Sequence, residues 1–500
     1  MQLNPPLHPP LRFGTDGWRG IVQEEFTFDR LGAVVPLAAA ALAQQFGDYP
    51  TKSGRRRAAI VVGYDRRFMS ETFAEFTADL LAKHGFAVLL ASEFAPTPAF
   101  SWAAFSQEAI GALVITASHN PPSYNGLKIK AAFGGSVGSE FTTALETRVN
   151  HGDRLEVASG GKVSLFDPWA EYCAVLRSKV NLDLICQKIA RQELAVFTDV
   201  MYGAAAGGLG KILPEVKITE LRWDKNTFMG GITPEPIAPN LSQMAYLISQ
   251  TTQSIPQRVG FAFDGDGDRI AALDRDGNFH SSQVLIPILI QHFCQNQGRT
   301  GEIIKTISGS DLIEKVAQFY GLPLHETPVG YKYIADRMLT QPGGLLGGEE
   351  SGGIGYGDHI PERDALLSAL YVLEAVALGG RDLGELHSNL QAEVGFKSSY
   401  DRIDRHLPDQ ASQTRLIETL RQQPFRQISD RAVVDINQVD GFKYRLEDGS
   451  WLMVRFSGTE PVLRLYCEAA DRERVSQMLA WINAWVEQFL QAKPQLELGF

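Results

Sequence analysis

Residues 109–128 read AIGALVITASHNPPSYNGLK. The first part, Ala109–Ile115, is apolar throughout and predicts a buried strand. Ser118 therefore follows the C-terminal end of a strand, which is where α/β proteins place their chemistry. Two prolines and an Asn-Gly pair after it predict a stiff, irregular loop. A serine held in this way, with His119 beside it and Lys128 further along, suits a nucleophile or a phosphoryl carrier. An ordinary turn with a solvated serine is the plain alternative.

Strands and helices alternate on the N-terminal side of this loop. Residues 59–64 and 86–91 predict strands, and Ser70–His84, which begins at a capping serine, predicts the helix between them. This alternation is typical of an α/β domain, which we expect to close near residues 160–161.

The same alternation continues toward the C-terminus. The expected strands are 194–197, 216–218, 259–263, 303–308, 432–436, 451–455 and 462–466. The expected helices are 169–180, 311–320, 365–378 and 472–490. The polar stretch between Leu390 and Arg431 predicts no element.

One of these strands, Val259–Phe263, runs directly into Asp264-Gly265-Asp266-Gly267-Asp268-Arg269. Carboxylates this close repel one another, and a divalent cation relieves the repulsion. Oxygen ligands suit Mg²⁺, and the glycines let the loop curl around one ion. An EF-hand is excluded, because Arg269 and Arg275 stand where that loop needs Gly and Glu. Two alternatives remain: an acidic surface turn, and Asp264 as a phosphorylated nucleophile.

Three further loops combine glycines with polar side chains. The N-terminal FGTDGWRG, residues 13–20, predicts close backbone approach around Arg19, although a surface arginine is the plain alternative. In Gly348–Gly353 (GEESGG), Glu349 and Ser351 could bind sugar hydroxyls, or the segment could be an exposed hairpin. Arg455–Pro461 (RFSGTEP) resembles a phosphate-binding nest, with a simple β-turn as the alternative.

Composition narrows the class of protein. A chain of 500 residues suggests about three or four domains. The net charge of −11 argues against a nucleic-acid partner, and no apolar run is long enough to span a bilayer. The N-terminus lacks the pattern of a secretory signal. The four cysteines form no C-x-x-C pair, which is typical of reduced thiols in a cytoplasmic protein.

Four of these loops, which contain Ser118, Asp264–Asp268, Glu349 and Arg455, resemble in this order those of the α-D-phosphohexomutases, the phosphoglucomutase and phosphomannomutase family. TASHNPP-x-YNG-x-K is similar to the family's phosphoserine loop, DGDGDR to its metal loop, GEESGG to its sugar-binding loop and RFSGTEP to its phosphate-binding loop. The resemblance implies three related α/β domains with mixed sheets and a smaller C-terminal α+β domain, all around a central cleft. The expected boundaries are 1–160, 161–280, 281–388 and 389–500.

The resemblance also implies roles for individual residues. Ser118 would carry the phosphoryl group and bind Mg²⁺ with Asp264, Asp266 and Asp268. Lys128 and Arg19 would handle protons or stabilise charge. As the proton acceptor we favour Lys128 or His119, which is next to Ser118, because the pKa of arginine is too high. The implied substrate-binding residues are Arg269, Gly330, Tyr331, Lys332, Glu349, Ser351 and Arg363. The implied phosphate-binding residues are Arg455, Ser457, Gly458, Thr459 and Arg464.

The implied reaction interconverts glucose 1-phosphate and glucose 6-phosphate, with glucose 1,6-bisphosphate as intermediate and activator. Small-molecule sugar phosphates are then the partners, without nucleic acid or membrane, and the protein is expected to be a monomer or a small homo-oligomer. Two positions depart from relatives: Gly353 stands where many have His, and Tyr331 where they have His or Trp. Mannose and glucosamine phosphates therefore remain alternative substrates, and glucose-1,6-bisphosphate synthase and a sugar-phosphate binding module remain alternative functions.

Overall fold

The computed structural model describes residues 9–491 apart from residues 15, 53, 55, 159, 252–253 and 458–460. The chain divides into two compact units. The first holds the described residues up to Ile304 together with Gly330–His387, and the second holds Lys305–Val329 and the described residues from Ser388 onward. No helix of the described part is both long and apolar enough to cross a membrane.

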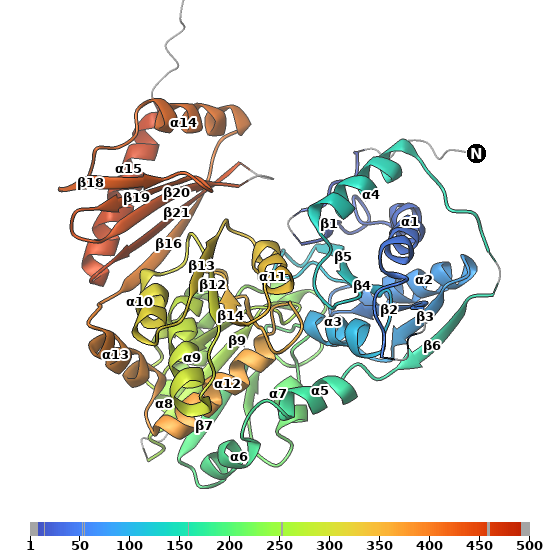
Figure 1. The fold of residues 1–500 in the computed structure, drawn as a ribbon, viewed down its shortest axis with the longest axis horizontal. Helices are drawn as coiled ribbons and strands as arrows, with labels where there is room; N and C mark the ends of the chain where they lie inside the picture. Colours follow the sequence, from blue (N-terminus) through green and yellow to red (C-terminus); the bar gives the residue numbers. More distant parts are fainter. Residues whose placement is uncertain are drawn as a thin grey trace, which may run out of the picture. The chain divides into compact units, whose positions relative to one another are not determined.

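The first unit begins with a six-stranded sheet in the order β1-β5-β4-β2-β3-β6. Its strands are β1 (Trp18–Ile21), β2 (Ala59–Tyr64), β3 (Ala87–Ala91), β4 (Gly111–Ile115), β5 (Tyr124–Ala131) and β6 (Lys162–Phe166). Strands β2, β3, β4 and β6 are parallel, whereas β5 is antiparallel to β4 and β1 to β5. Its helices are α1 (Phe28–Phe46), α2 (Ser70–Lys83), α3 (Thr97–Ser106) and α4 (Ser139–His151). They lie on both faces of the sheet (Figure 1).

A second sheet of the same unit has the order β11-β10-β9-β7-β8. Its strands are β7 (Leu194–Asp199), β8 (Thr219–Leu221), β9 (Gln257–Phe263), β10 (Ile270–Leu273) and β11 (Phe279–His280). Strands β7, β8 and β9 are parallel and the other pairs are antiparallel. The associated helices are α5 (Ala170–Arg177), α6 (Leu182–Ala190), α7 (Gly208–Ile212) and α8 (Ser242–Gln250), with short turns η1 (Met229–Gly231) and η2 (Ala238–Leu241). Strand β8 starts just after the segment 216–218 that the sequence predicts.

The rest of the first unit carries the sugar-binding motif of the sequence. Its elements are α9 (Ser282–Gln297), α11 (Tyr331–Thr340), the antiparallel pair β14 (Gly344–Gly348) and β15 (Ile354–Tyr356), and α12 (Ala365–Gly379). Helix α12 is buried along most of its length, because nearly all its side chains are apolar. Strand β12 (Glu302–Thr306) and helix α13 (Leu383–Val394) each run from the first unit into the second.

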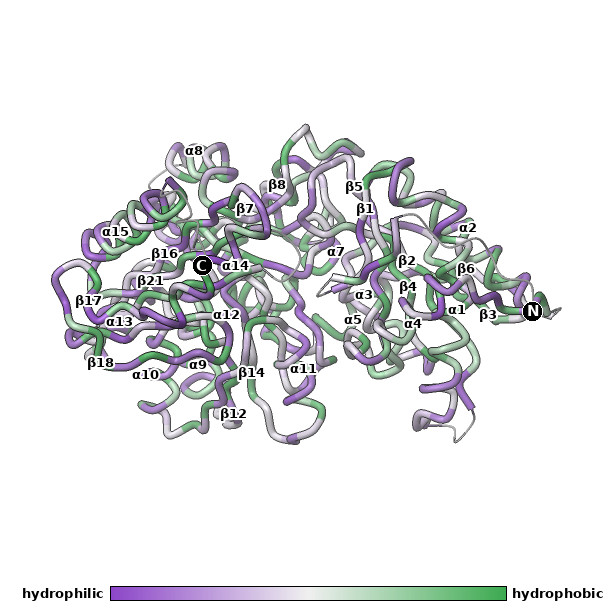
Figure 2. Tube along the Cα trace, turned by 90° about the horizontal axis from the view of Figure 1, so that it is seen from above, coloured by the Kyte–Doolittle hydropathy of each residue, from purple (hydrophilic) through white to green (hydrophobic). Residues whose placement is uncertain are grey.

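The second unit contains a six-stranded antiparallel sheet in the order β16-β21-β20-β19-β18-β17. Its strands are β16 (Ser399–His406), β17 (Gln427–Ile428), β18 (Arg431–Asn437), β19 (Phe442–Leu446), β20 (Trp451–Phe456) and β21 (Val462–Ala469). Its helices are α10 (Asp311–Phe319), α14 (Gln410–Gln422) and α15 (Arg472–Gln491), and β13 (Leu324–Thr327) completes it. Polar and apolar residues interleave along α15 (Figure 2), whose apolar side packs on the sheet core.

These sheets confirm the predicted fold class: mixed sheets in the α/β domains and a C-terminal antiparallel sheet covered by helices. Strand β16 and helix α14 lie in the stretch for which the sequence predicts nothing. In the first unit, β4 leads into the loop of Ser118 and β9 into Asp264–Asp268, so two strand ends bring the polar motifs together.

Candidate active site

Ser118 is buried and its side chain faces the aspartate loop. Its Oγ donates a hydrogen bond of 2.8 Å to Asp264 Oδ2 and lies 3.3 Å from His119 Nδ1. Its backbone φ is +51°, in the left-handed region that residues other than glycine rarely adopt. The backbone N–H donates to Thr116 Oγ1 at 2.9 Å. The loop therefore holds Ser118 in one strained orientation toward the carboxylates, as a covalent carrier requires.

The three carboxylates Asp264, Asp266 and Asp268 are fully buried, and one oxygen from each lies within 4.8 Å of the other two. Burial, followed by the charges of Asp268 and Asp266, raises the pKa of Asp264 well above its ordinary value. Asp266 Oδ1 and Asp268 Oδ1 accept no hydrogen bond from any described residue. Buried carboxylate oxygens without a hydrogen-bond donor cost free energy unless a cation binds them. This all-oxygen donor set fits a divalent cation such as Mg²⁺.

Two cations partly neutralise these acids. Lys128 Nζ lies 2.7 Å from Asp266 Oδ2 and 2.8 Å from Asp268 Oδ2. Arg363 Nη2 lies 2.8 Å from the same oxygen of Asp268. Burial acts to lower the pKa of Lys128, but Asp16, Asp266 and Asp268 outweigh it and raise the pKa above its usual range. Lys128 is therefore held in its charged form.

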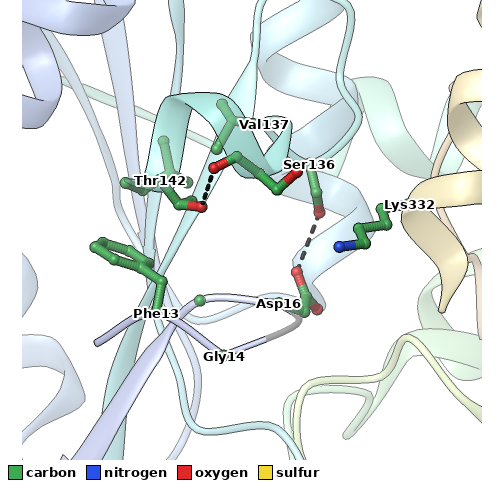
Figure 3. A pocket seen from close by; sticks show the side chains of 10 residues that line it. Phe13, Gly14, Asp16, Ser136, Val137, Thr142 and Lys332 are labelled. Carbon is green, nitrogen blue, oxygen red and sulfur yellow. Dashed lines mark hydrogen bonds between the residues drawn. The ribbon is translucent and has the colours of Figure 1, made fainter. Parts of the chain in front are cut away.

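Asp16, in the N-terminal glycine-rich loop, connects this cluster to a second one. Its Oδ2 lies 2.7 Å from Lys128 Nζ and also pairs with Arg363, while its Oδ1 accepts a hydrogen bond of 3.1 Å from Ser136 Oγ. Figure 3 shows Asp16 and Ser136 facing each other across a small pocket that Lys332 also lines. The sequence pattern of this loop pointed to Arg19 and gave no role to Asp16. Its position between two glycines was the available signal.

Lys130 and Glu362 form the other end of the same network. Lys130 Nζ lies 2.5 Å from Glu362 Oε2, and Ser136 Oγ lies 3.2 Å from the same oxygen. Lys130 is 0 % exposed and Glu362 1 % exposed, so each of these buried charged groups needs an oppositely charged partner. Neither residue was a sequence candidate, and neither was Thr97, whose Oγ1 donates to Asp266 Oδ2 at 2.5 Å.

The sugar-binding motif lies beside the aspartate loop. Arg269 forms an isolated antiparallel bridge with Gly353, and the N–H of Ile270 donates to the carbonyl of Gly352 at 2.9 Å. Burial raises the pKa of Glu349 to about 7, against the opposing effect of Arg363, whose Nη1 lies 3.5 Å from Glu349 Oε2.

Several polar atoms of these residues have no hydrogen-bond partner among the described residues. These buried atoms are Glu349 Oε2, Ser351 Oγ, Arg269 Nε and Arg363 Nε. Unsatisfied groups of this kind cost free energy in an apolar surrounding, and a polar ligand would satisfy them. The set contains both acceptors and donors, which matches the hydroxyl groups of a sugar.

The turn at Gly330 places its neighbours in different surroundings. Gly330 has φ +131°, which favours glycine. Tyr331 is only 7 % exposed, and its ring lies beneath the Arg363 guanidinium at 5.4 Å. A Cβ at Gly353 would lie 2.3 Å from Arg363 Cδ, so a side chain there would displace this arginine. The two residues that differ from relatives, Tyr331 and Gly353, therefore both lie against the Arg363 side chain.

His119 and Arg19 flank Ser118. Arg19 Nη1 donates to Asn120 Oδ1 at 2.5 Å, within the Ser118 loop. Burial, followed by the positive charges of Arg269 and Arg19, lowers the pKa of His119 well below its ordinary value. The imidazole of His119 is therefore neutral at physiological pH.

The expected phosphate-binding loop lies in the second unit. Its Gly458 and Thr459 are outside the described residues, whereas Arg455 and Ser457 are at the end of β20. Arg455 Nε lies 3.0 Å from Asp440 Oδ2, which also accepts the backbone N–H of Val329 at 2.9 Å. Arg464 on β21 is in register with Arg455. Two arginines thus stand on adjacent strands of this sheet.

This chain is similar to known proteins along nearly its whole length. Four domain models match in order: phosphoglucomutase/phosphomannomutase α/β/α domain I over residues 10–156, domain II over 170–277, domain III over 281–394, and the C-terminal domain over 416–483.

Individual relatives cover nearly the full chain as well. The phosphoglucomutase/phosphomannomutase of Thermococcus kodakarensis is 28% identical, covering 93% of this chain and 96% of its own. The phosphoglucosamine mutase of Nostoc punctiforme is 29% identical, covering 97% and 92%. The crystal structure of a candidate phosphomannomutase from Thermus thermophilus has a TM-score of 0.82 at 30% identity, covering 96% of this chain and 99% of its own.

Proposed function

Because this chain belongs to the phosphoglucomutase/phosphomannomutase family of phosphohexomutases, we propose that it interconverts glucose 1-phosphate and glucose 6-phosphate through phosphorylated Ser118. Enzymes of this family are intramolecular phosphotransferases of the isomerase class. The hydrogen bond of 2.8 Å between Ser118 Oγ and Asp264 Oδ2 carries the proposal, because it sets a strained serine against a buried carboxylate cluster. Glucose 1,6-bisphosphate is the intermediate and also the compound that first phosphorylates Ser118.

The transfer moves one phosphoryl group at a time. The 6-hydroxyl oxygen of glucose 1-phosphate forms a bond to the phosphorus of phospho-Ser118, and the bond from Ser118 Oγ breaks. The hydroxyl proton passes to His119, which is neutral. The bisphosphate then turns over, and Ser118 Oγ forms a bond to the phosphorus on O1 while the bond from that phosphorus to O1 breaks. O1 takes back the proton from His119, and glucose 6-phosphate leaves. The two half-reactions are chemically equivalent, so Ser118 ends as it began.

Charge stabilisation is the main task of the surrounding groups. A phosphoserine carries about −1.5 to −2 charges at pH 7. Asp264, Asp266 and Asp268 would hold Mg²⁺ beside it, and the bound cation would neutralise phosphate charge and polarise the phosphorus. Lys128 stays charged in its ion pairs and acts through its field instead of as a base, and Arg19 adds a second positive group beside the loop.

Substrate binding falls to the unsatisfied polar atoms. Glu349 and Ser351 would bind the sugar hydroxyls, and Arg269 and Arg363 would line the same site. Arg455, Ser457, Gly458, Thr459 and Arg464 are proposed to bind the phosphate that is not being transferred. Lys332 and Gly330 belong to the proposed sugar-contacting turn, with Tyr331 supporting Arg363 from below.

The identity of the sugar is the open part of this proposal. The names of the relatives support glucosamine phosphate and mannose phosphate at least as well as glucose phosphate. The experiment therefore uses ³¹P NMR on the purified protein with Mg²⁺, a trace of the matching 1,6-bisphosphate, and glucose, mannose or glucosamine 1-phosphate in parallel. The fastest 6-phosphate formation identifies the substrate.

Ser118→Ala and removal of metal test the mechanism in the same assay. We expect Ser118→Ala to lose more than about 10³-fold in activity, because the proposed mechanism carries the phosphoryl group on Ser118. Chelation with EDTA should abolish turnover, and added Mg²⁺ should restore it. Full activity in Ser118→Ala would contradict the proposal and direct attention to Asp264 as the nucleophile.

Two other outcomes would identify different functions. Bisphosphate that accumulates only with a stoichiometric phosphoryl donor would indicate a glucose-1,6-bisphosphate synthase. Binding of sugar phosphates without turnover under any condition would indicate a binding module.

A further inference from the structure

One buried arginine, outside all four loop motifs, binds the backbone of the Ser118 loop. Arg67 Nη2 donates to the carbonyl oxygens of Ser118 and Asn120, both at 2.6 Å. Its Nη1 donates to the carbonyls of Pro121 at 2.8 Å and Tyr124 at 3.2 Å. A single guanidinium therefore satisfies four carbonyl groups that face one point. Only the planar fork of arginine offers this many donors in one plane.

The surroundings of Arg67 fix its own position. Its side chain is fully buried, and its Nε lies 3.5 Å from Asp65 Oδ2. Asp65 Oδ1 accepts hydrogen bonds from the backbone N–H of Arg67 at 2.9 Å and from Ser70 Oγ at 2.6 Å. Ser70 Oγ in turn accepts from Asn125 Nδ2 at 3.0 Å, at the far end of the loop. The network therefore holds both ends of the loop against the end of β2 and the start of α2.

The conformation of Ser118 requires such a restraint. A non-glycine residue at φ +51° is strained and persists only where its surroundings impose this conformation. The carbonyl of Ser118 is the group that Arg67 holds, so the hydrogen bond acts on the peptide unit next to the strained φ. If that carbonyl turned away, Oγ would lose its alignment with Asp264.

We propose that Arg67 is a positioning residue that holds Ser118 in the orientation needed to receive and deliver the phosphoryl group. In the part of the chain that the structure describes, it forms no hydrogen bond or ion pair with Asp264, Asp266 or Asp268, and on the proposed function, on which this inference rests, it does not contact the sugar. Its contribution acts through the backbone of the loop. Misplacement of a reacting atom by about 1 Å typically lowers a rate about 10²-fold, so the effect belongs to kcat.

A cavity that Arg67 lines makes the proposal testable by chemical rescue. Arg67 and Asp65 line this cavity together with Phe94, Lys225 and Thr227. Removing the arginine side chain would join its space to this cavity. A guanidinium ion could then enter and restore the hydrogen bonds to the loop.

The experiment measures kcat, KM and the rate at which Ser118 is phosphorylated by the 1,6-bisphosphate, followed by intact mass. We expect Arg67→Lys to lower kcat and the phosphorylation rate about 10²-fold while KM changes by less than about threefold. We expect Arg67→Ala to lose more, and millimolar methylguanidinium to recover at least about tenfold of that loss. Arg66→Lys is the matched control, because Arg66 binds the carbonyl of Trp223 and not the loop.

Three results would overturn the inference. Arg67→Lys could retain the kcat of the unaltered protein. Its loss could track the fraction of folded protein, measured by thermal unfolding, with kcat per folded molecule unchanged. Methylguanidinium could leave Arg67→Ala unchanged although that variant is folded. Ser118→Ala separates the two levels: if it is inactive while Arg67→Lys is normal, only the positioning inference fails, and if Ser118→Ala is active, the proposed function fails.

Discussion

Gly265 shows at the scale of one residue how the two central loops fit together. A Cβ at this position would lie 2.3 Å from the carbonyl oxygen of Ser118, far inside van der Waals contact. The neighbour is backbone, so it cannot swing aside as a flexible side chain would. The same carbonyl accepts a hydrogen bond of 2.6 Å from Arg67 Nη2. Gly265 is therefore required by the close approach of the Ser118 loop.

Gly265→Ala should disable the enzyme without unfolding it. The methyl group must push the Ser118 loop away from Asp264, and we expect kcat to fall about 10²-fold or more, with a smaller effect on KM. Steady-state kinetics beside a thermal unfolding curve measures both effects. Gly210→Ala is the matched control, since a Cβ there meets nothing within 4 Å. Wild-type kcat in Gly265→Ala would show that the loops are less closely packed than described.

Helix α12 illustrates the scale of a single element. Its side chains are almost all buried, so its stability depends on packing and on how its N-terminus is satisfied. Asp364 is the N-cap, and its Oδ1 accepts the N–H of Leu367 at 2.9 Å and the hydroxyl of Tyr172 at 2.8 Å. One carboxylate thus caps the helix and pairs a buried hydroxyl from α5.

Asp364→Ala should destabilise the protein by about 2–4 kcal/mol. Loss of the cap contributes about 1 kcal/mol, and the unpaired, buried Tyr172 hydroxyl about 1–3 kcal/mol. Urea unfolding measures the change in the free energy of unfolding. Asp364→Asn should retain most of the stability, because Asn caps helices as well as Asp and can still accept from Tyr172. A change below about 0.5 kcal/mol in Asp364→Ala would contradict this account.

The whole molecule is built from two units with separate apolar cores. The core of the second unit includes Leu420, Leu465 and Ile482, which are at most 1 % exposed, with Trp481 and Trp485 partly buried against it. The first unit has its own core, to which Leu370 of α12 belongs. A chain with two cores need not unfold as one cooperative system.

Ile482→Ala should therefore lower the stability of one unit only. Truncating a buried isoleucine typically costs about 2–5 kcal/mol. In urea unfolding followed by hydrogen exchange, we expect amides of β19–β21 and α15 to lose protection at lower urea while those of β2 and β4 do not shift. Leu370→Ala should produce the converse pattern. A single transition that moves as a whole in both variants would show that the two units unfold together.

Sequence alone predicted several of the elements that are apolar without interruption, although it gave no prediction for helices α1 and α9, which also contain long apolar runs. The strands that became β4 and β9 are buried on both faces, so nearly every residue in them is apolar and the pattern is clear. Strand β16 and helix α14 were missed because their exposed, polar sides dilute the signal, and much of β16 is only partly buried. Local composition is therefore one of the factors that decide which elements can be predicted.

The features of the candidate site also differ in how far local sequence predicts them. Ser118 with its stiff loop, the three aspartates and the glycine-rich motifs were predictable, because each is encoded by a few adjacent residues whose types serve one purpose. That Ser118 meets the aspartates was expected only from the family resemblance, because the strands that lead to them, β4 and β9, belong to different sheets. What the sequence could not supply is which charges pair.

Only the tertiary structure decided the roles of Asp16, Arg67 and Glu362. Asp16 and Arg363 form an ion pair across 347 positions of the chain, and Arg67 reaches the carbonyl of Ser118 across 51. No local pattern marks such residues, because any solvated surface holds Asp, Arg and Glu. Burial makes the difference: away from water an unpaired charge is prohibitive, so the fold must supply each of these groups with its partner.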